Sequence, residues 1–127
     1  MEKVKYIINK WLQAVNNGEL ENLISLYDKK AILIPTFSNR LLKNPEDIRE
    51  YFIKLGSREN LSVDLHKKTL IIQKLKYNLY TASGIYCWQF CLDGEQLSFE
   101  ARFTFIFDLL SASPIIQHHS SQIPRTL

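Results

Sequence analysis

The spacing of apolar residues divides the chain into a helical first part and a strand-rich second part. Between positions 4 and 15, apolar side chains recur every three or four residues, which is typical of an amphipathic helix. The segment Asn16-Asn17-Gly18 ends this helix, because glycine suits a left-handed C-terminal cap. A shorter stripe predicts a second helix and consists of Leu20, Leu23, Ile24 and Tyr27.

The next two elements have local start and stop signals. The run Ala31–Ile34 is rich in β-branched residues and precedes a proline, so it predicts a short strand. After a loop over residues 36–43, Asn44 can cap a third helix that has Pro45 at its first position and two acidic residues in its first turn. Gly56 ends this helix.

The remainder of the chain is predicted to be β-structure. Turn residues and β-branched or aromatic runs place four strands at Ser62–Lys74, Tyr80–Leu92, Gln96–Leu109 and Ile115–Gln122. The dipeptide Asp93-Gly94 indicates a tight hairpin between the second and third of them. We therefore expect one α+β domain over residues 1–127, in which a twisted antiparallel sheet curls over the helices and leaves a cavity at its open end.

Charge and hydropathy add little to this picture. The net charge is only +3 and is scattered, and the densest basic stretch, over residues 67–76, is the pattern of a solvated strand rather than of a nucleic-acid surface. No apolar run approaches the ~18 residues of a membrane span. The N-terminal segment has no signal-peptide core, so we expect a cytoplasmic protein that does not engage membranes.

The two cysteines and the histidines predict neither a disulfide nor a metal site. Cys87 and Cys91 lie in one predicted strand, where their Cα atoms would be about 13 Å apart, too far for a bond that needs less than about 7 Å. The pair His118-His119 has no carboxylate or thiolate beside it, and His66 is distant in sequence. We expect no metal and no cofactor.

Three stretches together resemble a known superfamily. Residues 31–39 (AILIPTFSN) follow a helix that ends Leu-Tyr-Asp, residues 100–107 read EARFTFIF, and residues 118–121 read HHSS with a proline shortly after. In combination they resemble the SnoaL-like and kinase-association branch of the nuclear transport factor 2-like superfamily, especially the association domain of calcium/calmodulin-dependent protein kinase II and its small stand-alone relatives. The resemblance covers residues 11–124.

The resemblance implies a cone-shaped roll, also called cystatin-like, in which a curved and mainly antiparallel sheet wraps on three N-terminal helices. It also implies a homodimer formed through the outer sheet face and a deep pocket with arginines that could receive an acidic ligand. Related folds include ketosteroid isomerase and SnoaL-type cyclases, and many stand-alone members have no established activity.

Arg102 is the most informative candidate in the predicted pocket. Strand alternation places it on the same face as Glu100 and opposite to Phe103, Phe105 and Phe107. Its position matches the pocket-facing arginine of the resembling domain, so it either anchors a carboxylate or forms an internal ion pair with Glu100.

The phenylalanine row of the same strand has two interpretations. The rings of Phe103, Phe105 and Phe107 either form core beneath the helices or cover the outer face of the sheet. If Arg102 points inward, the rings must point outward, where a monomer rarely tolerates such a patch. We therefore predict that they form the dimer interface.

Other candidates would line the pocket. Tyr86, Trp88 and Phe90 share one strand face, which the pattern places inward, either as a ligand wall or as an aromatic core. Phe37, in the loop from Pro35 to Arg40, would close the pocket.

The two histidines near the end of the chain point to opposite faces of a regular strand, so only one of them can enter the pocket. Ser120 shares the face of His118, and Ser121 shares that of His119. The inward histidine would be a proton carrier, a ligand contact or a structural hydrogen-bonding group.

The sequence favours a small-ligand-binding or oligomerisation domain over an enzyme. The alternative is an isomerase, cyclase or lyase, with His118, His119 or Glu100 as the proton carrier, or Asp28 as the base beside a tyrosine hydroxyl. No carboxylate–tyrosine pair is marked by spacing, which weakens the enzyme hypothesis. The class of ligand stays open between small acidic and small aromatic molecules.

Overall fold

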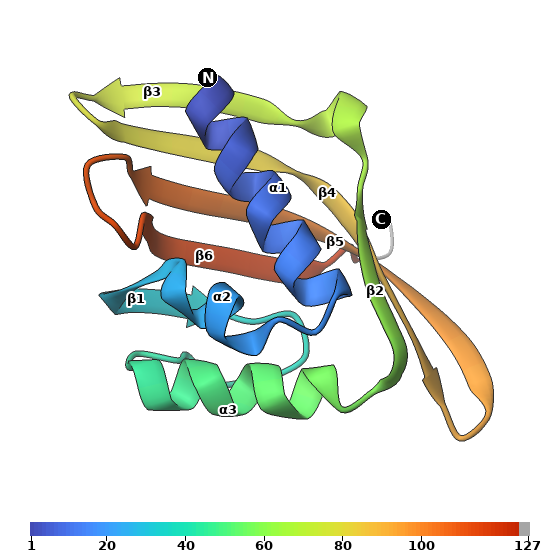
Figure 1. Ribbon diagram of the computed structural model, residues 1–127. Coiled ribbons are helices and arrows are strands. Elements are labelled where there is room, and N and C mark those ends of the chain that lie inside the picture. Colours follow the sequence, from blue (N-terminus) through green and yellow to red (C-terminus); the bar gives the residue numbers. More distant parts are fainter. Residues whose placement is uncertain (125–127) are drawn as a thin grey trace.

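The structure is a computed structural model that describes residues 1–124, in which helices pack against a strongly bent sheet (Figure 1). Within these residues the helices are α1 (Glu2–Asn16), α2 (Leu20–Ser25) and α3 (Pro45–Gly56), with a 3-10 turn, η1, at Lys67–Thr69. The strands are β1 (Tyr27–Ile34), β2 (Glu59–Leu65), β3 (Ile71–Lys76), β4 (Leu79–Leu92), β5 (Glu95–Asp108) and β6 (Ile115–Gln122). The α+β architecture predicted from the sequence is confirmed.

The sheet is mixed rather than a plain meander. Its order is β1-β6-β5-β4-β2, and β3 also pairs with β4. The first strand runs parallel to the last, whereas the other pairs are antiparallel. As Figure 1 shows, β4 and β5 are long and extend past the other strands as a hairpin. The early strand therefore closes one edge of the sheet beside the chain's last strand.

The single strand predicted over Ser62–Lys74 is wrong, because η1 divides it into β2 and β3. The break is fixed by two hydrogen bonds to β4: the His66 N–H donates to the Ile85 carbonyl (3.0 Å), and the Ile85 N–H donates to Thr69 Oγ1 (2.9 Å). Gly84 provides the space for this crossing, because a Cβ there would lie 3.1 Å from Thr69 Oγ1. A side-chain pattern alone does not reveal such a crossing.

The turn and cap signals of the sequence are confirmed. Asp93 and Gly94 have φ values of 52° and 79°, the left-handed conformation of a two-residue hairpin turn. Asn44 Oδ1 accepts the Asp47 N–H at 2.9 Å and caps α3. Gly18, at φ 67°, follows the C-terminus of α1 as expected.

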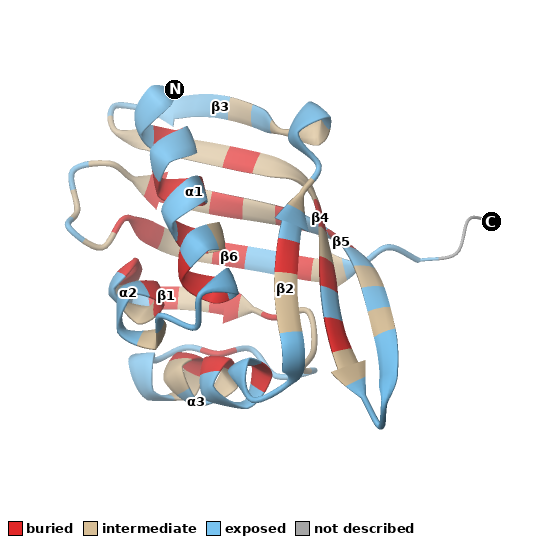
Figure 2. Ribbon diagram, turned by 45° about the vertical axis from the view of Figure 1, so that its right-hand side comes forward, coloured by how far each residue is buried: buried red, intermediate tan, exposed pale blue. Residues whose placement is uncertain are grey.

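The core lies between α1 and the concave face of the sheet. Helix α1 crosses the strands, and buried positions alternate with more exposed ones along β4 and β5 (Figure 2). Trp11 of α1 is 1% exposed and packs on the rings of Tyr86 and Phe105, with centroid distances of 5.6 and 5.5 Å. The aromatic inner face of the sheet is therefore the main partner of the first helix.

The predicted orientation of β5 is wrong. Phe103, Phe105 and Phe107 are at most 3% exposed and belong to the core, so they cannot form a dimer interface on the outer face. The reason is the hairpin register, which pairs Tyr86 with Ala101 and Gly84 with Phe103, so that the phenylalanine row shares the inward face of Tyr86. Arg102, opposite Ile85, is exposed on the outer face.

No helix in residues 1–124 is both long enough and apolar enough to cross a bilayer.

Candidate functional site

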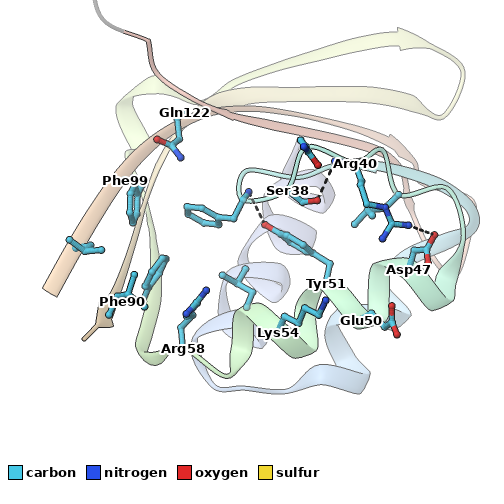
Figure 3. A pocket seen from close by; sticks show the side chains of 16 residues that line it. Ser38, Arg40, Asp47, Glu50, Tyr51, Lys54, Arg58, Phe90, Phe99 and Gln122 are labelled. Carbon is cyan, nitrogen blue, oxygen red and sulfur yellow. Dashed lines mark hydrogen bonds and ion pairs between the residues drawn. The ribbon is translucent and has the colours of Figure 1, made fainter. Parts of the chain in front are cut away.

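A cavity of about 850 Å³ opens between α3, the loop that follows β1, and the far end of the β4–β5 hairpin (Figure 3). We call it the rim pocket. Its walls come from residues 37–40 and Leu42, from one side of α3 and Arg58 just after it, from the ends of β4 and β5 near their connecting turn, and from Gln122 of β6. The rim pocket thus lies where the sheet curls beyond the end of α1.

Aromatic rings form one wall of the rim pocket. Phe37, Phe90 and Phe99 pack as a trio, with centroid distances of 5.3–5.5 Å between each pair. Phe37 comes from the loop, and the other two come from neighbouring strands. This wall offers a flat apolar surface to a ligand, and Phe37, which was predicted to close a pocket, belongs to it.

Positive side chains line the rim pocket from the loop, from α3 and from the residues just after it. Arg40 pairs with Asp47 at 3.5 Å. Lys54 and Arg58 line the same cavity and have no carboxylate within ion-pair distance among residues 1–124. The Arg58 guanidinium carbon lies 5.7 Å from the centroid of the Phe90 ring, so this cation stands directly beside the aromatic wall.

Tyr51 points its hydroxyl into the space between these walls (Figure 3). The Tyr51 oxygen accepts the backbone N–H of Phe37 at 3.3 Å, which ties α3 to the loop. Burial raises the pKa of Tyr51 to about 12, so the phenol stays protonated near neutral pH. Its own hydrogen is therefore available to an acceptor atom inside the rim pocket.

A second group of polar side chains is buried under α1, away from the rim pocket. The Trp11 indole N–H donates to the Tyr27 hydroxyl at 3.0 Å. The Tyr27 oxygen lies 2.8 Å from His118 Nδ1, and the Tyr86 oxygen lies 3.1 Å from His118 Nε2. We call these four residues the buried network.

The buried network implies one protonation pattern. Because Tyr27 already accepts from Trp11, its own hydrogen is free to donate to His118 Nδ1, which leaves the imidazole proton on Nε2, facing Tyr86. Burial, and secondarily the charge of His119, lowers the pKa of His118 to about 3. The imidazole is thus neutral near neutral pH and is enclosed by rings, with Phe105 stacked on it at 3.9 Å.

The network continues toward the loop. The hydroxyl groups of Ser120 and Thr36 contact each other, and both lie near the Tyr86 oxygen, where they oppose the strong upward effect of burial on the pKa of Tyr86. Thr36 is the neighbour of Phe37 in the loop. A chain of polar contacts therefore joins the centre of the core to the border of the rim pocket.

The structure answers the open question about the paired histidines. His118 and Ser120 are each 2% exposed and face inward, whereas His119 is exposed on the outer face. The expected inward row of Tyr86, Trp88 and Phe90 is confirmed in its orientation, because all three are buried. Of these inward residues, only Phe90 lines the rim pocket.

Two of the predicted site residues lie elsewhere. Arg102 does not form an ion pair with Glu100; the Glu100 carboxylate lies 3.1 Å from His66 Nε2 instead, and both of those side chains are about half exposed. Arg102 and Glu100 both belong to the outer sheet face and are not among the residues that line the rim pocket. The predicted inward position of Arg102 is therefore wrong.

The residues of the cationic wall, Lys54 and Arg58, were not among the site residues predicted from the sequence. The available signal was their spacing: Tyr51, Lys54 and Arg58 follow one another at intervals of three and four residues, which places them on one side of α3 and its extension.

The described residues contain no group of three or more histidine, cysteine or acidic side chains arranged to hold a metal ion. Cys87 and Cys91 are both unpaired thiols, and burial raises the pKa of Cys87.

Several solved structures share this fold. A protein from Xanthomonas campestris, provisionally described as a calcium/calmodulin dependent protein kinase II association domain, matches with a TM-score of 0.85 at 24% identity, over 97% of this chain and 87% of that chain. A protein from Streptomyces avermitilis, provisionally described as a dehydratase of the NTF2-like family, matches with a TM-score of 0.83 at 13% identity, over 98% and 96% of the two chains.

A third structure, an NTF2-like protein with a cystatin-like fold from Novosphingobium aromaticivorans, has a TM-score of 0.78 at 13% identity and covers 98% of this chain and 82% of that one. At these identities the likeness establishes the fold. A search of curated protein sequences found no match.

The family assignment comes from the sequence model of the calcium/calmodulin dependent protein kinase II association domain, which matches residues 1–124. Since that match spans nearly the whole chain and the fold is the NTF2-like, cystatin-like one, the chain belongs to the calcium/calmodulin dependent protein kinase II association domain family.

Proposed function

We propose that this chain is an oligomerisation domain that also binds a small amphipathic acid in its rim pocket. The ligand would place an aromatic or aliphatic body against Phe37, Phe90 and Phe99 and an anionic group near Lys54 and Arg58. The observation behind this proposal is the pairing, in one cavity of about 850 Å³, of an aromatic wall with two cations that lack a carboxylate partner among residues 1–124.

Physical chemistry favours an acid over a neutral ligand here. A guanidinium beside a ring can form two parallel hydrogen bonds to a carboxylate, and the ring excludes water from one side of that contact. The protonated Tyr51 hydroxyl supplies a further donor. A body of aromatic size fits a cavity of this volume, which is in the usual range for small-ligand sites.

Calorimetric titration with a matched pair of probes tests the ligand class. We expect 4-isopropenylbenzoate to bind and to raise the melting temperature, and its uncharged amide to bind at least about 10-fold more weakly. In Arg58→Ala this preference for the acid should largely disappear. Lys29→Ala removes an exposed cation from β1, outside the pocket, and should leave it unchanged.

A preference for the acid that persists in both Arg58→Ala and Lys54→Ala would contradict the anion site. Equal binding of the acid and the amide to the unmodified protein would contradict it as well.

The proposed self-association uses the outer face of the sheet, with residues different from those first predicted. Half-buried apolar side chains gather there on neighbouring strands, where Ile106 of β5 pairs with Gln117 of β6, which in turn pairs with Ile32 of β1. Thr104 and Ser83 share a hydroxyl contact of 3.2 Å on the same face. Membership of an association-domain family supports a second copy of this chain as the partner.

Light scattering tests this arrangement. Ile106→Glu places a charge at the centre of the proposed interface and should convert the dimer to a monomer without unfolding it. Leu110→Glu changes a 78% exposed residue in the β5–β6 connection, outside the sheet face, and should leave the dimer intact. A dimer that persists in Ile106→Glu would contradict the outer-face model.

A further inference from the structure

The strongest unexplained feature of the molecule is an unpaired donor just behind the rim pocket. The side chain of Trp88 is 2% exposed, and its indole N–H is the one buried side-chain polar atom that has no hydrogen-bond partner among residues 1–124. A buried donor without a partner costs about 1–3 kcal/mol relative to a satisfied one. Such a group in a folded protein calls for an acceptor that binds there.

Other donors surround the same spot. The Trp88 N–H lies beside the Tyr86 hydroxyl, as do the hydroxyls of Ser120 and Thr36. If His118 donates its Nε2 proton to the Tyr86 oxygen, the Tyr86 hydrogen can donate to Ser120 or Thr36. Those two hydroxyls contact each other, which leaves one of their hydrogens free. A group that only accepts hydrogen bonds would satisfy that hydrogen and the Trp88 N–H.

The cluster is separated from the rim pocket by a single ring. Phe37 lines the rim pocket on one side and contacts the Trp88 ring on the other, edge to face, with a centroid distance of 5.8 Å. It sits in a connecting loop, and its side chain is only half-buried. A change of its side-chain rotamer would vacate the volume that its ring now fills beside Trp88 and open that volume to the rim pocket.

We infer that Phe37 covers an inner subsite, in which the Trp88 N–H and the Thr36 and Ser120 hydroxyls bind a carbonyl oxygen of the ligand. No cation is part of this cluster, so a carboxylate would be costly to bury there, whereas a neutral carbonyl needs only donors. The ligand class narrows to aromatic acids that have a ketone, amide or ester carbonyl at the end opposite to the carboxylate. This inference rests on the function proposed above, which places the carboxylate at Arg58.

A pair of isosteric acids tests the inner subsite. In 4-acetylbenzoate a carbonyl oxygen replaces the terminal methylene group of 4-isopropenylbenzoate, and the two molecules are otherwise alike. We expect the keto acid to bind about 3- to 10-fold more tightly to the unmodified protein. In Thr36→Val, which replaces the hydroxyl by a methyl group of similar shape, and in Trp88→Phe, the advantage should fall to less than about twofold. Ser98→Ala, at an exposed position of β5 that does not line the rim pocket, should retain it.

Nuclear magnetic resonance of protein with ¹⁵N-labelled tryptophan gives an independent measurement. The chain has two tryptophans, hence two indole signals, and Trp11 serves as an internal reference because its N–H is already bonded to Tyr27. The keto acid should shift the Trp88 signal, while the isopropenyl acid should leave it nearly unchanged. Phe37→Ala should speed exchange of the Trp88 N–H with water but not that of Trp11.

The possible outcomes separate the two proposals. Equal affinities for the two acids, with an unmoved Trp88 signal, would overturn the inner subsite while the rim pocket stands. An unchanged exchange rate in Phe37→Ala would overturn the covering role of that ring. If neither acid binds to the unmodified protein, the rim-pocket proposal fails and the inner subsite fails with it.

Discussion

Strands β4 and β5 pass through two regions of the molecule. Aromatic residues of these strands form core in one region and a pocket wall in the other. In the first, which we call the closed half, Tyr86 and Phe105 lie under α1 and enclose His118. In the second, which we call the open half, Phe90 and Phe99 pack against the loop ring of Phe37 and border the rim pocket.

The difference lies in what covers the rings. Helix α1 ends at Asn16 and lies over only part of the long hairpin (Figure 1). Beneath the helix, the ring of Trp11 stacks on Tyr86 at an interplanar angle of 9° and fills the space. Beyond it, the same inward alternation of side chains leaves a cavity. An aromatic stripe therefore becomes core or pocket wall according to the length of the neighbouring helix, and the stripe itself does not decide between them.

The largest expected effect comes from a charge placed in the closed half. Phe105→Glu buries a carboxylate among aromatic rings and should abolish folding, at a cost of more than about 4 kcal/mol, measured by urea unfolding followed by circular dichroism. Ser98→Glu, at an exposed position of the same strand outside the proposed interface, should cost less than about 1 kcal/mol. If the Phe105→Glu protein is instead folded and monomeric, the result would support an outward-facing Phe105 in the unmodified protein.

The buried histidine should make stability depend on pH. The pKa of His118 is lowered from 6.5 to about 3 in the folded protein, so the unfolded chain takes up a proton at higher pH, and stability falls as the pH decreases from 6.5 toward 3. At pH 4.5 this single group should account for about 2–3 kcal/mol of lost stability.

The comparison that isolates this effect is between the unmodified protein and His118→Gln, which cannot titrate. The difference in unfolding free energy between the two should shrink as the pH is lowered from 7 to 4.5. His119→Gln, on the exposed face, serves as the control and should leave the pH dependence unchanged. An identical pH dependence in all three proteins would show that His118 is accessible to protons in the folded state.

Removing a tyrosine hydroxyl should cause a smaller loss of stability, and the loss should differ between the two halves. Tyr27→Phe deprives both Trp11 and His118 of a buried partner and should destabilise the protein by about 1–3 kcal/mol. Tyr51→Phe loses one longer bond, of 3.3 Å, beside a water-accessible cavity and should cost less than about 1 kcal/mol. Chemical denaturation midpoints measure both, and equal losses would contradict the distinction between the halves.

The smallest expected effect concerns the tight crossing of η1 over β4. Gly84→Ala brings a Cβ to 3.1 Å from both Phe103 Cζ and Thr69 Oγ1, so one of them must shift, and the cost should be about 1 kcal/mol. Gly56→Ala meets no atom within 4 Å and should be neutral or slightly stabilising in the same thermal-melting assay. A Gly84→Ala protein as stable as the Gly56→Ala variant would show that the crossing is looser than the geometry indicates.

Local signals in the sequence determined the helices, most strands, the Asn44 cap and the two-residue turn at Asp93-Gly94. That turn also determined the relation between the strands, because closing it pairs Leu92 with Glu95 and, six residues further on, Tyr86 with Ala101. An inward Tyr86 therefore excludes an inward Arg102. The error arose because the orientation of Arg102 was taken from family resemblance, whereas the register of the hairpin already opposed it.

Only the tertiary structure decided the rest. The parallel pairing of β1 with β6, the division of the predicted strand by η1 and the place of Phe37 between pocket and core all depend on contacts between residues far apart in the chain. A side-chain pattern records which face of an element is apolar. It does not record which other element covers that face, since this depends on how the sheet bends and where the helix ends. For that reason the sequence supplied the aromatic side chains of this protein, and the fold determined which of them are core and which border a binding site.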